Sequence, residues 1–238
     1  MANTFFQFKQ FTVHQEHCAM KVCTDACIQG AFTAQYLVDK PVPAILDIGA
    51  GTGLLSLMLA QQTRAAITAV ELDPAAAVQA RANFAASPWA DRLVLTETDI
   101  RDMAAVCPYD FIITNPPFYE QALKSGHAQK DQAMHATNLS YQALISAIDR
   151  QLAPSGEVSV LLPYTAFENF RALAVVAGFQ LREVLNIRQS VDHGFFRTVG
   201  IFSRQAGDTT IKELAIHEAN RVYTSDFTSL LTPYYLYL

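Results

Sequence analysis

The fold of this 238-residue chain is decided by the stretch Leu46-Asp47-Ile48-Gly49-Ala50-Gly51-Thr52-Gly53. An apolar run leads into it and a helical pattern over residues 53–62 follows, so the glycines lie between a predicted buried strand and a predicted helix. Glycines at such a junction let the backbone approach a ligand closely and leave helix N–H groups free to bind it. A dinucleotide fingerprint requires a third glycine where Leu54 stands, so the Gly-x-Gly-x-Gly spacing disfavours a nicotinamide enzyme.

Apolar segments and helical patterns alternate along the rest of the chain. The predicted strands cover residues 44–48, 66–72, 93–98, 109–114 and 157–162, and the predicted helices cover 53–62, 74–86, 141–152 and 167–177. Residues 180–187 and 195–202 are expected to form a strand hairpin, and residues 210–216 are strand-like. Strands separated by helices predict an α/β fold with a doubly wound, mostly parallel, seven-stranded sheet covered on both faces.

The chain is predicted to form a single domain over residues 1–238. Residues 44–238 would make the core. Residues 1–43, with a bent strand or hairpin over 5–13 and a helix over 26–38, would pack on it as an N-terminal extension. The aromatic end over residues 233–238 is too apolar to extend into water, so we expect it to pack back on the domain.

Composition narrows the class of protein. A hydrophobic content of 51% and a charged content of 16% exclude a disordered chain. No apolar run reaches the ~20 residues that a membrane span needs, and no basic start followed by an apolar core opens the sequence, so we expect a soluble, cytoplasmic protein. The cysteines form no C-x-x-C motif and are expected to be reduced thiols without a metal; they are Cys18, Cys23, Cys27 and Cys107.

The net charge of −5 comes from the N-terminal half, because residues 1–123 carry 7 basic and 12 acidic side chains and residues 124–238 carry 10 of each. The sequence therefore has no large basic segment of the kind common in nucleic-acid-binding proteins. A local basic patch stays open, with a solvated face as the alternative. Its candidates are Arg182, Arg188, Arg197 and Arg204, with Phe195 and Phe196 among them.

Polar side chains follow the ends of the next three predicted strands, at Glu71, Asp99 and Asn115. Because ligands of such folds bind at the carboxyl ends of the strands, we expect these side chains and the glycine stretch to share one crevice. The prolines after Asn115 fix the backbone. The Asn115 side-chain oxygen and the Pro116 carbonyl could then accept both N–H bonds of a planar amino group, with Phe118 stacked on its ring. The alternative is a tight turn that closes the strand.

In order and spacing, these motifs resemble those of the S-adenosylmethionine-dependent methyltransferases that modify exocyclic or amide nitrogens. Weaker similarity over residues 8–11, 18–22, 24–25, 54–61 and 87–90 and at the aromatic C-terminus resembles, more narrowly, the bacterial tRNA1(Val) adenine-N6-methyltransferase family. The resemblance implies a Rossmann-like fold, S-adenosylmethionine as cofactor, and the anticodon stem-loop of a tRNA as partner, methylated at N6 of adenine 37. It implies no metal and no membrane, and a monomer is favoured.

The resemblance also implies roles for individual residues. The catalytic residues would be Asn115, Pro116, Pro117 and Phe118, and the substrate base would be contacted by Phe118 and Tyr119. The cofactor would be contacted by Lys21, Thr24, Asp25, Asp47, Gly49, Ala50, Gly51, Gly53, Glu71, Leu72, Asp99, Ile100 and Asn115. Among these, Glu71 would hold the ribose and Asp99 the adenine. Residues 21, 24 and 25 would close over the methionine end.

Some alternatives stay open. Cys23, Cys27 and Met134 depart from the family pattern, which often has an arginine in place of Met134, so a role of residues 124–137 in binding RNA stays open. The Asn-Pro-Pro-Phe motif also serves enzymes that methylate guanine N2 or adenine N6 in ribosomal RNA, or the amide of a protein glutamine. From a different class, the fold could be a non-catalytic cofactor-binding module.

Overall fold

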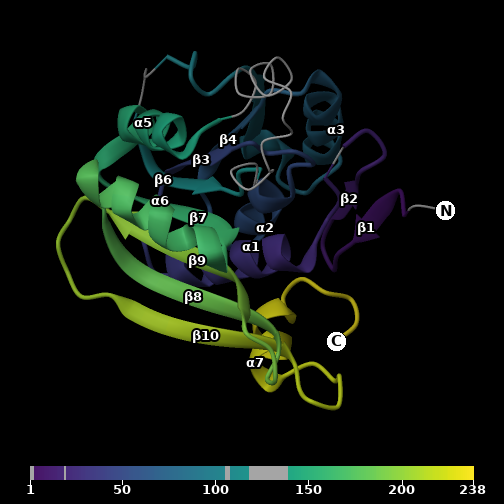
Figure 1. The fold of residues 1–238 in the computed structure, drawn as a ribbon. Helices are drawn as coiled ribbons and strands as arrows, with labels where there is room; N and C mark the ends of the chain where they lie inside the picture. Colours follow the sequence, from purple (N-terminus) through teal and green to yellow (C-terminus); the bar gives the residue numbers. More distant parts are fainter. Residues whose placement is uncertain (1–2, 19, 105–107, 118–138) are drawn as a thin grey trace, which may run out of the picture.

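The computed structural model describes residues 3–18, 20–104, 108–117 and 139–238, and an eight-stranded sheet forms its centre (Figure 1). The strands follow in the spatial order β10-β8-β9-β7-β6-β3-β4-β5. Their bounds are Ala44–Ile48 (β3), Ala66–Glu71 (β4), Leu93–Glu97 (β5), Tyr109–Thr114 (β6), Leu152–Pro163 (β7), Gln180–Ser190 (β8), Phe195–Ser203 (β9) and Thr210–His217 (β10). Only β9 runs antiparallel to its neighbours, β7 and β8.

The predicted α/β fold with a doubly wound, mostly parallel sheet is confirmed. The sheet has eight strands rather than the predicted seven, because the strand-like segment 210–216 pairs in parallel with β8 as an edge strand. The predicted hairpin is also present, since β8 and β9 pair antiparallel. β7 begins at Leu152 instead of residue 157, directly after the helix that precedes it.

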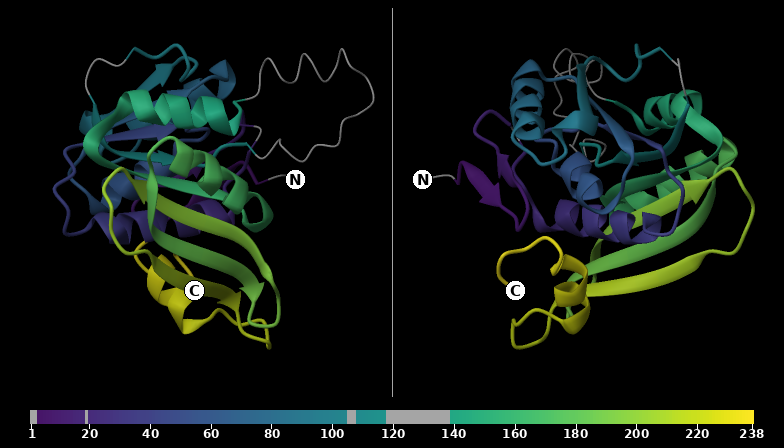
Figure 2. Two further views of the ribbon diagram at one scale, coloured as in Figure 1. Left: turned by 60° about the vertical axis from the view of Figure 1, so that its left-hand side comes forward. Right: turned by 180° about the vertical axis from the view of Figure 1, so that it is seen from behind.

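Helices cover both faces of the sheet (Figures 1 and 2). They are Thr24–Leu37 (α1), Leu54–Gln62 (α2), Pro74–Ala85 (α3), Tyr141–Gln151 (α5), Tyr164–Val176 (α6) and Ser225–Leu231 (α7), with a short 3-10 helix over Ala90–Arg92. Side chains of α1, α2 and α7 form one core with one face, and those of α5 and α6 form a second core with the other. None of the described helices is both long and apolar enough to cross a membrane.

Alternation along β3 decides which side chains enter which core. Ile45 belongs to the core under α1 and α2, whereas Leu46 and Ile48 belong to the core under α5 and α6. Successive side chains of a strand point to opposite faces, so Asp47 shares the face of Ile45 and points toward α2. A carboxyl group is thereby placed inside the core, directly before the glycine stretch.

Local capping explains where two of the helices begin. α3 begins at Pro74 after Asp73, whose side chain accepts the backbone N–H of Ala76 at 3.2 Å. An N-cap carboxylate followed by proline in the first turn is a strong helix start. α5 begins after Ser140, whose hydroxyl accepts the backbone N–H of Ala143 at 3.2 Å. These starts fix the chain's direction after β4 and before β7.

The two ends of the chain pack against each other. The N-terminal segment forms an antiparallel hairpin of two strands, Phe5–Gln7 (β1) and Thr12–His14 (β2). Phe8 forms a β-bridge with Tyr235, and the backbone N–H of Lys9 donates to the carbonyl of Tyr234 at 2.8 Å. Tyr234 is buried, so the aromatic end packs back on the domain as predicted, although Tyr237 is 88% exposed.

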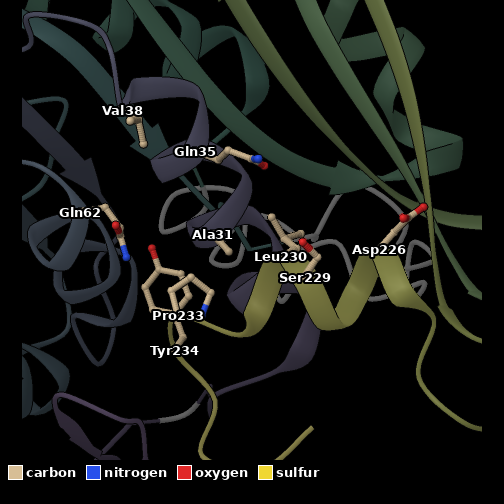
Figure 3. Close-up of a pocket in the computed structure, with 9 residues that line it drawn as sticks. All are labelled: Ala31, Gln35, Val38, Gln62, Asp226, Ser229, Leu230, Pro233 and Tyr234. Carbon is tan, nitrogen blue, oxygen red and sulfur yellow. The ribbon is translucent and has the colours of Figure 1, made fainter.

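A pocket of about 320 Å³ lies between α1, the end of α2 and the segment from α7 to Tyr234 (Figure 3). It is lined by Ala31, Gln35, Val38, Gln62, Asp226, Ser229, Leu230, Pro233 and Tyr234. Among the residues that the structure describes, none of those predicted to bind cofactor or substrate lines this pocket. The glycine stretch, Glu71, Asp99 and Asn115 lie instead at the carboxyl ends of the parallel strands β3, β4, β5 and β6.

Candidate active site

The glycine stretch forms a loop between β3 and α2. Gly49, Gly51 and Gly53 have φ angles of 74°, 55° and 81°, a left-handed conformation that glycine adopts without a steric penalty. The backbone N–H groups of Gly49 and Ala50 donate to the Val70 carbonyl at 2.9 and 3.0 Å, which ties the loop to the end of β4. A Cβ at Gly49 or Gly51 would meet nothing within 4 Å, so the space above these residues is open.

Gly53 differs from the other two glycines because it faces the protein. A Cβ there would lie 2.4 Å from Cε1 of Phe84 on α3. Gly53 is therefore required both by its φ angle and by the close packing of the loop against α3. The loop combines an open outer surface with a tightly packed inner one.

Glu71 lies at the end of β4 and contacts the glycine loop directly. Its Oε2 accepts the backbone N–H of Gly51 at 2.7 Å, and its Oε1 accepts that of Asp73 at 2.8 Å. The carboxylate is half-buried, and the next side chain, Leu72, is 53% exposed. The structure therefore brings Glu71 and the loop together, with an exposed apolar side chain beside them.

Asp47 lies beneath the loop and is fully buried. Its Oδ2 accepts the Ser56 backbone N–H at 3.1 Å and the Ser56 hydroxyl at 2.7 Å, whereas its Oδ1 has no partner among the described residues. Burial raises the pKa of Asp47 to about 7; the two bonds from Ser56 oppose this rise and the charge of Glu71 adds to it. Near neutral pH, this carboxyl group is poised between its two protonation states.

Asp99 follows β5 and is held by its neighbour Arg101. The Arg101 guanidinium lies 2.5 Å from Asp99 Oδ2 and its backbone N–H donates to Oδ1 at 2.8 Å. The bonds from Arg101 lower the pKa of Asp99 and keep it ionised. The next residue, Ile100, is buried in the core under α5 and α6, so only the carboxylate of this pair reaches the surface of the site.

Asn115 and Pro116 follow β6 beside the glycine loop. Thr114 pairs in register with Ile48, and its hydroxyl donates to the Ile48 carbonyl at 2.9 Å. The Asn115 Oδ1 is buried and has no hydrogen-bond partner among the described residues, and Pro116 is buried while Pro117 is exposed. A buried amide oxygen without a donor is unusual. It is an acceptor available to an amino group. Phe118 and Tyr119 lie outside the described residues.

Gln29 on α1 is a candidate functional residue that the sequence did not reveal. It is fully buried, and its Nε2 donates to the carbonyl of Thr114 at 2.9 Å. The hydroxyls of Thr33 and Ser159 form a 2.8 Å hydrogen bond next to it. Gln29 therefore supports the strand end from which Asn115 projects. An amide among the apolar residues of a predicted helix was its only signal.

The residues expected to close over the cofactor lie around the start of α1. Thr24 is exposed there. Asp25, one turn before Gln29, accepts from Arg197 Nε at 2.8 Å. Lys21 donates through Nζ to the carbonyl of Gln15. Gln29, one turn further along α1 than Asp25, is hydrogen-bonded to the carbonyl of Thr114, so the start of α1 lies near the end of β6. Contact between this segment and a cofactor stays a prediction.

The cysteines and acidic residues form no cluster suited to a metal ion in the part of the chain that the structure describes. Cys18, Cys23 and Cys27 are free thiols. Burial is the main cause that raises their pKa values, to about 11 for Cys18 and about 12 for the other two. Such thiols are protonated and unreactive at neutral pH. Cys107 lies outside the described residues.

The amino-acid sequence resembles those of known proteins. Residues 30–163 match the family described as Methyltransferase small domain. The chain is 42% identical to the tRNA1(Val) (adenine(37)-N6)-methyltransferase of Dyadobacter fermentans over 98% of each chain. It is 39% identical to the protein of the same name from Pectobacterium carotovorum, over 98% of this chain and 94% of the relative.

Solved structures share the fold at low sequence identity. A predicted O-methyltransferase from Agrobacterium tumefaciens superposes with a TM-score of 0.67 at 18% identity, over 88% of this chain and 96% of its own. A glycopeptide N-methyltransferase solved with S-adenosylmethionine superposes with a TM-score of 0.56 at 12% identity, over 74% of this chain and 93% of its own. At these identities the likeness concerns the fold alone.

Proposed function

The chain belongs to the Methyltransferase small domain family and to the tRNA1(Val) (adenine(37)-N6)-methyltransferases, and we propose that it methylates N6 of adenine 37 in tRNA1(Val). It is a methyltransferase that uses S-adenosylmethionine. The observation at the site that supports methylation of an amino nitrogen is the buried Oδ1 of Asn115, which has no hydrogen-bond partner among the described residues. A tRNA substrate would place the enzyme in the cytoplasm.

The residues present fit S-adenosylmethionine, which when bound supplies an activated methyl group on a sulfonium. The open space over Gly49 and Gly51 would take the chain that carries the sulfonium, because no Cβ obstructs it. Glu71 would accept the ribose hydroxyls, and Asp99, kept ionised by Arg101, would accept from the cofactor's adenine amino group. The glycine loop, Glu71 and Asp99 follow the neighbouring strands β3, β4 and β5, so one ligand could contact all three.

Asn115 and Pro116 would prepare the acceptor nitrogen. The amino group of adenine is a weak nucleophile because its lone pair is delocalised into the ring. When the Asn115 oxygen and the Pro116 carbonyl accept its two N–H bonds, the nitrogen becomes more pyramidal and the positive charge that develops on it is dispersed. These bonds are stronger in the transition state than in the ground state, which is the condition for catalysis. The product cation is acidic, so no dedicated strong base is needed.

The backbone on both sides of Asn115 is restrained before substrate binds. The hydroxyl of Thr114 and the amide of Gln29 fix the preceding strand end, and the prolines at 116 and 117 restrict the backbone that follows. When the reacting groups are aligned in this way, an encounter between two free molecules is replaced by a reaction within one complex. This alignment supplies much of the reduction in the barrier to methyl transfer. The target adenine must leave its stack to reach this position. We propose that Phe118 stacks on it, a contact worth ~1–3 kcal/mol.

A methylation assay tests the substrate. The protein is incubated with methyl-labelled S-adenosylmethionine and separate samples of tRNA1(Val), ribosomal RNA and a release factor, and the digests are analysed. The proposal expects N6-methyladenosine from the tRNA, and no label in a tRNA1(Val) transcript that carries guanine at position 37. N2-methylguanosine in ribosomal RNA or methylglutamine in the release factor would replace it. Cofactor binding without transfer to any acceptor would indicate a non-catalytic module.

The variant Asn115→Ala tests the mechanism. We expect its turnover to fall on the order of 10²-fold or more, as when a transition-state hydrogen-bond partner is removed. Its affinity for S-adenosylmethionine, measured by calorimetry, should stay near that of the unmodified enzyme. Turnover equal to that of the unmodified enzyme would end this mechanism.

A further inference from the structure

The carboxyl ends of the parallel strands form one edge of the sheet, and this edge extends beyond β6, the strand that precedes Asn115. The part beyond β6 has no role in the mechanism proposed above. Strand order places β3, β4 and β5, which carry the glycine loop, Glu71 and Asp99, on one side of β6. The strands β7, β9 and β8 lie on the other side. With the cofactor on the first half, a polynucleotide that delivers a base to Asn115 has the second half on which to lie.

Two aromatic rings meet on this second half. Tyr164 begins α6 directly after β7, and Phe195 begins β9. Their ring centroids are 5.4 Å apart, and Tyr164 is 44% exposed. The pairing of Pro163 with Arg197 keeps these two strand ends adjacent. The rings therefore form a small exposed platform on the same edge of the sheet as Asn115.

The platform is close enough to the catalytic loop for one strand of RNA to reach both. Thr114 pairs in register with Val160 of β7. β7 extends three residues further, to Pro163, which at the usual rise of a strand is roughly 10 Å. Nucleotides next to an adenine held at Asn115 would therefore lie over Tyr164 and Phe195.

Arg188 adds a cation to the platform. Its guanidinium lies 5.7 Å from the centroid of the Phe195 ring, because Arg188 and Phe195 pair across β8 and β9. Its ion pair with Glu213 is loose at 3.7 Å, and that carboxylate is 54% exposed, so it contributes little. The Arg188 side chain is 31% exposed although its Nε is buried, so a ligand would meet the exposed part of the side chain rather than Nε. A phosphate oxygen would be a suitable acceptor for this side chain.

A hollow of about 440 Å³ adjoins the platform between α6 and the strands β8 and β10. Tyr164 lines it together with Val184, Asn186 and Thr209 and with Glu168 and Arg171, which form an ion pair with each other, so its wall offers both apolar contact and hydrogen-bonding groups. This composition suits a nucleotide better than an apolar partner. Since the chain carries a net charge of −5, stacking and a single well-placed cation would have to replace a broad basic surface.

From these contacts we infer that Tyr164, Phe195 and Arg188 form the surface on which the tRNA nucleotides flanking the target adenine lie. The two rings stack on bases and the Arg188 guanidinium binds a backbone phosphate. The inference rests on the proposed function and names the part of the enzyme that holds the RNA. It assigns to these residues binding of the polynucleotide and no part in methyl transfer.

The experiment measures tRNA1(Val) affinity and its salt dependence, together with kcat and the KM for tRNA. Arg188→Ala should weaken tRNA binding roughly tenfold and reduce the salt slope by about 0.7, the contribution of one phosphate contact. Tyr164→Leu should weaken binding roughly tenfold through lost stacking, whereas Tyr164→Phe, which keeps the ring, should bind like the unmodified enzyme. Affinity for S-adenosylmethionine should not change in any of these variants.

Arg204→Ala is the matched control. Arg204 also lies over a phenylalanine ring, that of Phe179 at 4.8 Å, and also forms an ion pair, with Asp149 at 2.7 Å. It follows the opposite end of β9, so its removal should leave tRNA affinity unchanged; thermal melts verify folding. Unchanged tRNA affinity in Arg188→Ala and Tyr164→Leu would overturn the inference, as would an equal loss in Arg204→Ala. Failure of the unmodified enzyme to methylate tRNA would instead overturn the proposed function.

Discussion

The substitution Asp47→Asn tests the buried carboxyl group beneath the glycine loop. Asp47 is inaccessible to solvent, and among the described residues its carboxyl group is hydrogen-bonded through Oδ2 alone, to Ser56. Burial raises its pKa from the ordinary 3.8 to about 7. Asparagine has nearly the same shape and keeps an acceptor for Ser56, but it cannot titrate. The variant therefore removes the proton linkage with little change in packing.

The raised pKa makes the protein less stable as the pH rises. Between pH 3.8 and about 7, the folded state holds a proton at Asp47 that the unfolded state has released. The free energy of unfolding therefore falls by about 1.4 kcal/mol per pH unit over this window. The total loss is about 4 kcal/mol at most. Below the window the stabilisation is fully present, and above pH 7 both states are ionised and the loss is complete.

Urea unfolding of both proteins between pH 4.5 and 8, without cofactor, measures this linkage. The unfolding free energy of Asp47→Asn should rise relative to that of the unmodified protein as the pH increases, and the difference should level off above pH 7. Groups common to both proteins cancel in this difference. Ser56→Ala removes the hydroxyl bond, one of the two bonds that lower the Asp47 pKa, and should extend the fall to higher pH. A difference that stays constant over the whole range would refute the reasoning.

Two further substitutions test the packing around the site. Gly53→Ala forces a left-handed conformation on alanine and brings its Cβ to 2.4 Å from Phe84, so urea unfolding should show a loss of about 2 kcal/mol or more. In Gly49→Ala the new Cβ meets no neighbour, so the free energy of unfolding should fall only by the cost of the left-handed conformation. An equal loss of unfolding free energy in the two variants would contradict this reasoning. Gln29→Leu removes the donor to the Thr114 carbonyl, so kcat should fall roughly tenfold at unchanged KM for S-adenosylmethionine; an unaltered kcat would exclude the supporting role.

The site was predictable where its residues follow strands in a regular pattern. Glu71 and Asn115 each end an apolar run, and parallel strands bring such ends together, so local periodicity was sufficient to place both beside the glycine loop. Gln29 could not be found in this way, because its partner Thr114 is 85 positions away and the contact depends on how α1 lies against the sheet. From the sequence, Arg188 and Phe195 could be identified only as candidates for a local basic patch, and a solvated face was the alternative.

Strand order explains the remaining difference between sequence and structure. Periodicity predicted that 180–187 and 195–202 pair, and they do. It could not predict that β9 inserts between β7 and β8, which leaves β8 free to accept β10 as an additional edge strand. Such pairings are decided by long-range packing rather than by the residues within each strand.

The contact between the two ends of the chain has a consequence for biosynthesis. Phe8 and Lys9 are synthesised more than 200 residues before their partners Tyr235 and Tyr234. At usual translation speeds this interval is roughly 10 to 45 s. During that time the aromatic side chains of the N-terminal hairpin lack their native partners and are available to chaperones. A nascent chain that stalls shortly before Tyr234 would contain all eight strands of the sheet but could not form the contact between Phe8 and Tyr235.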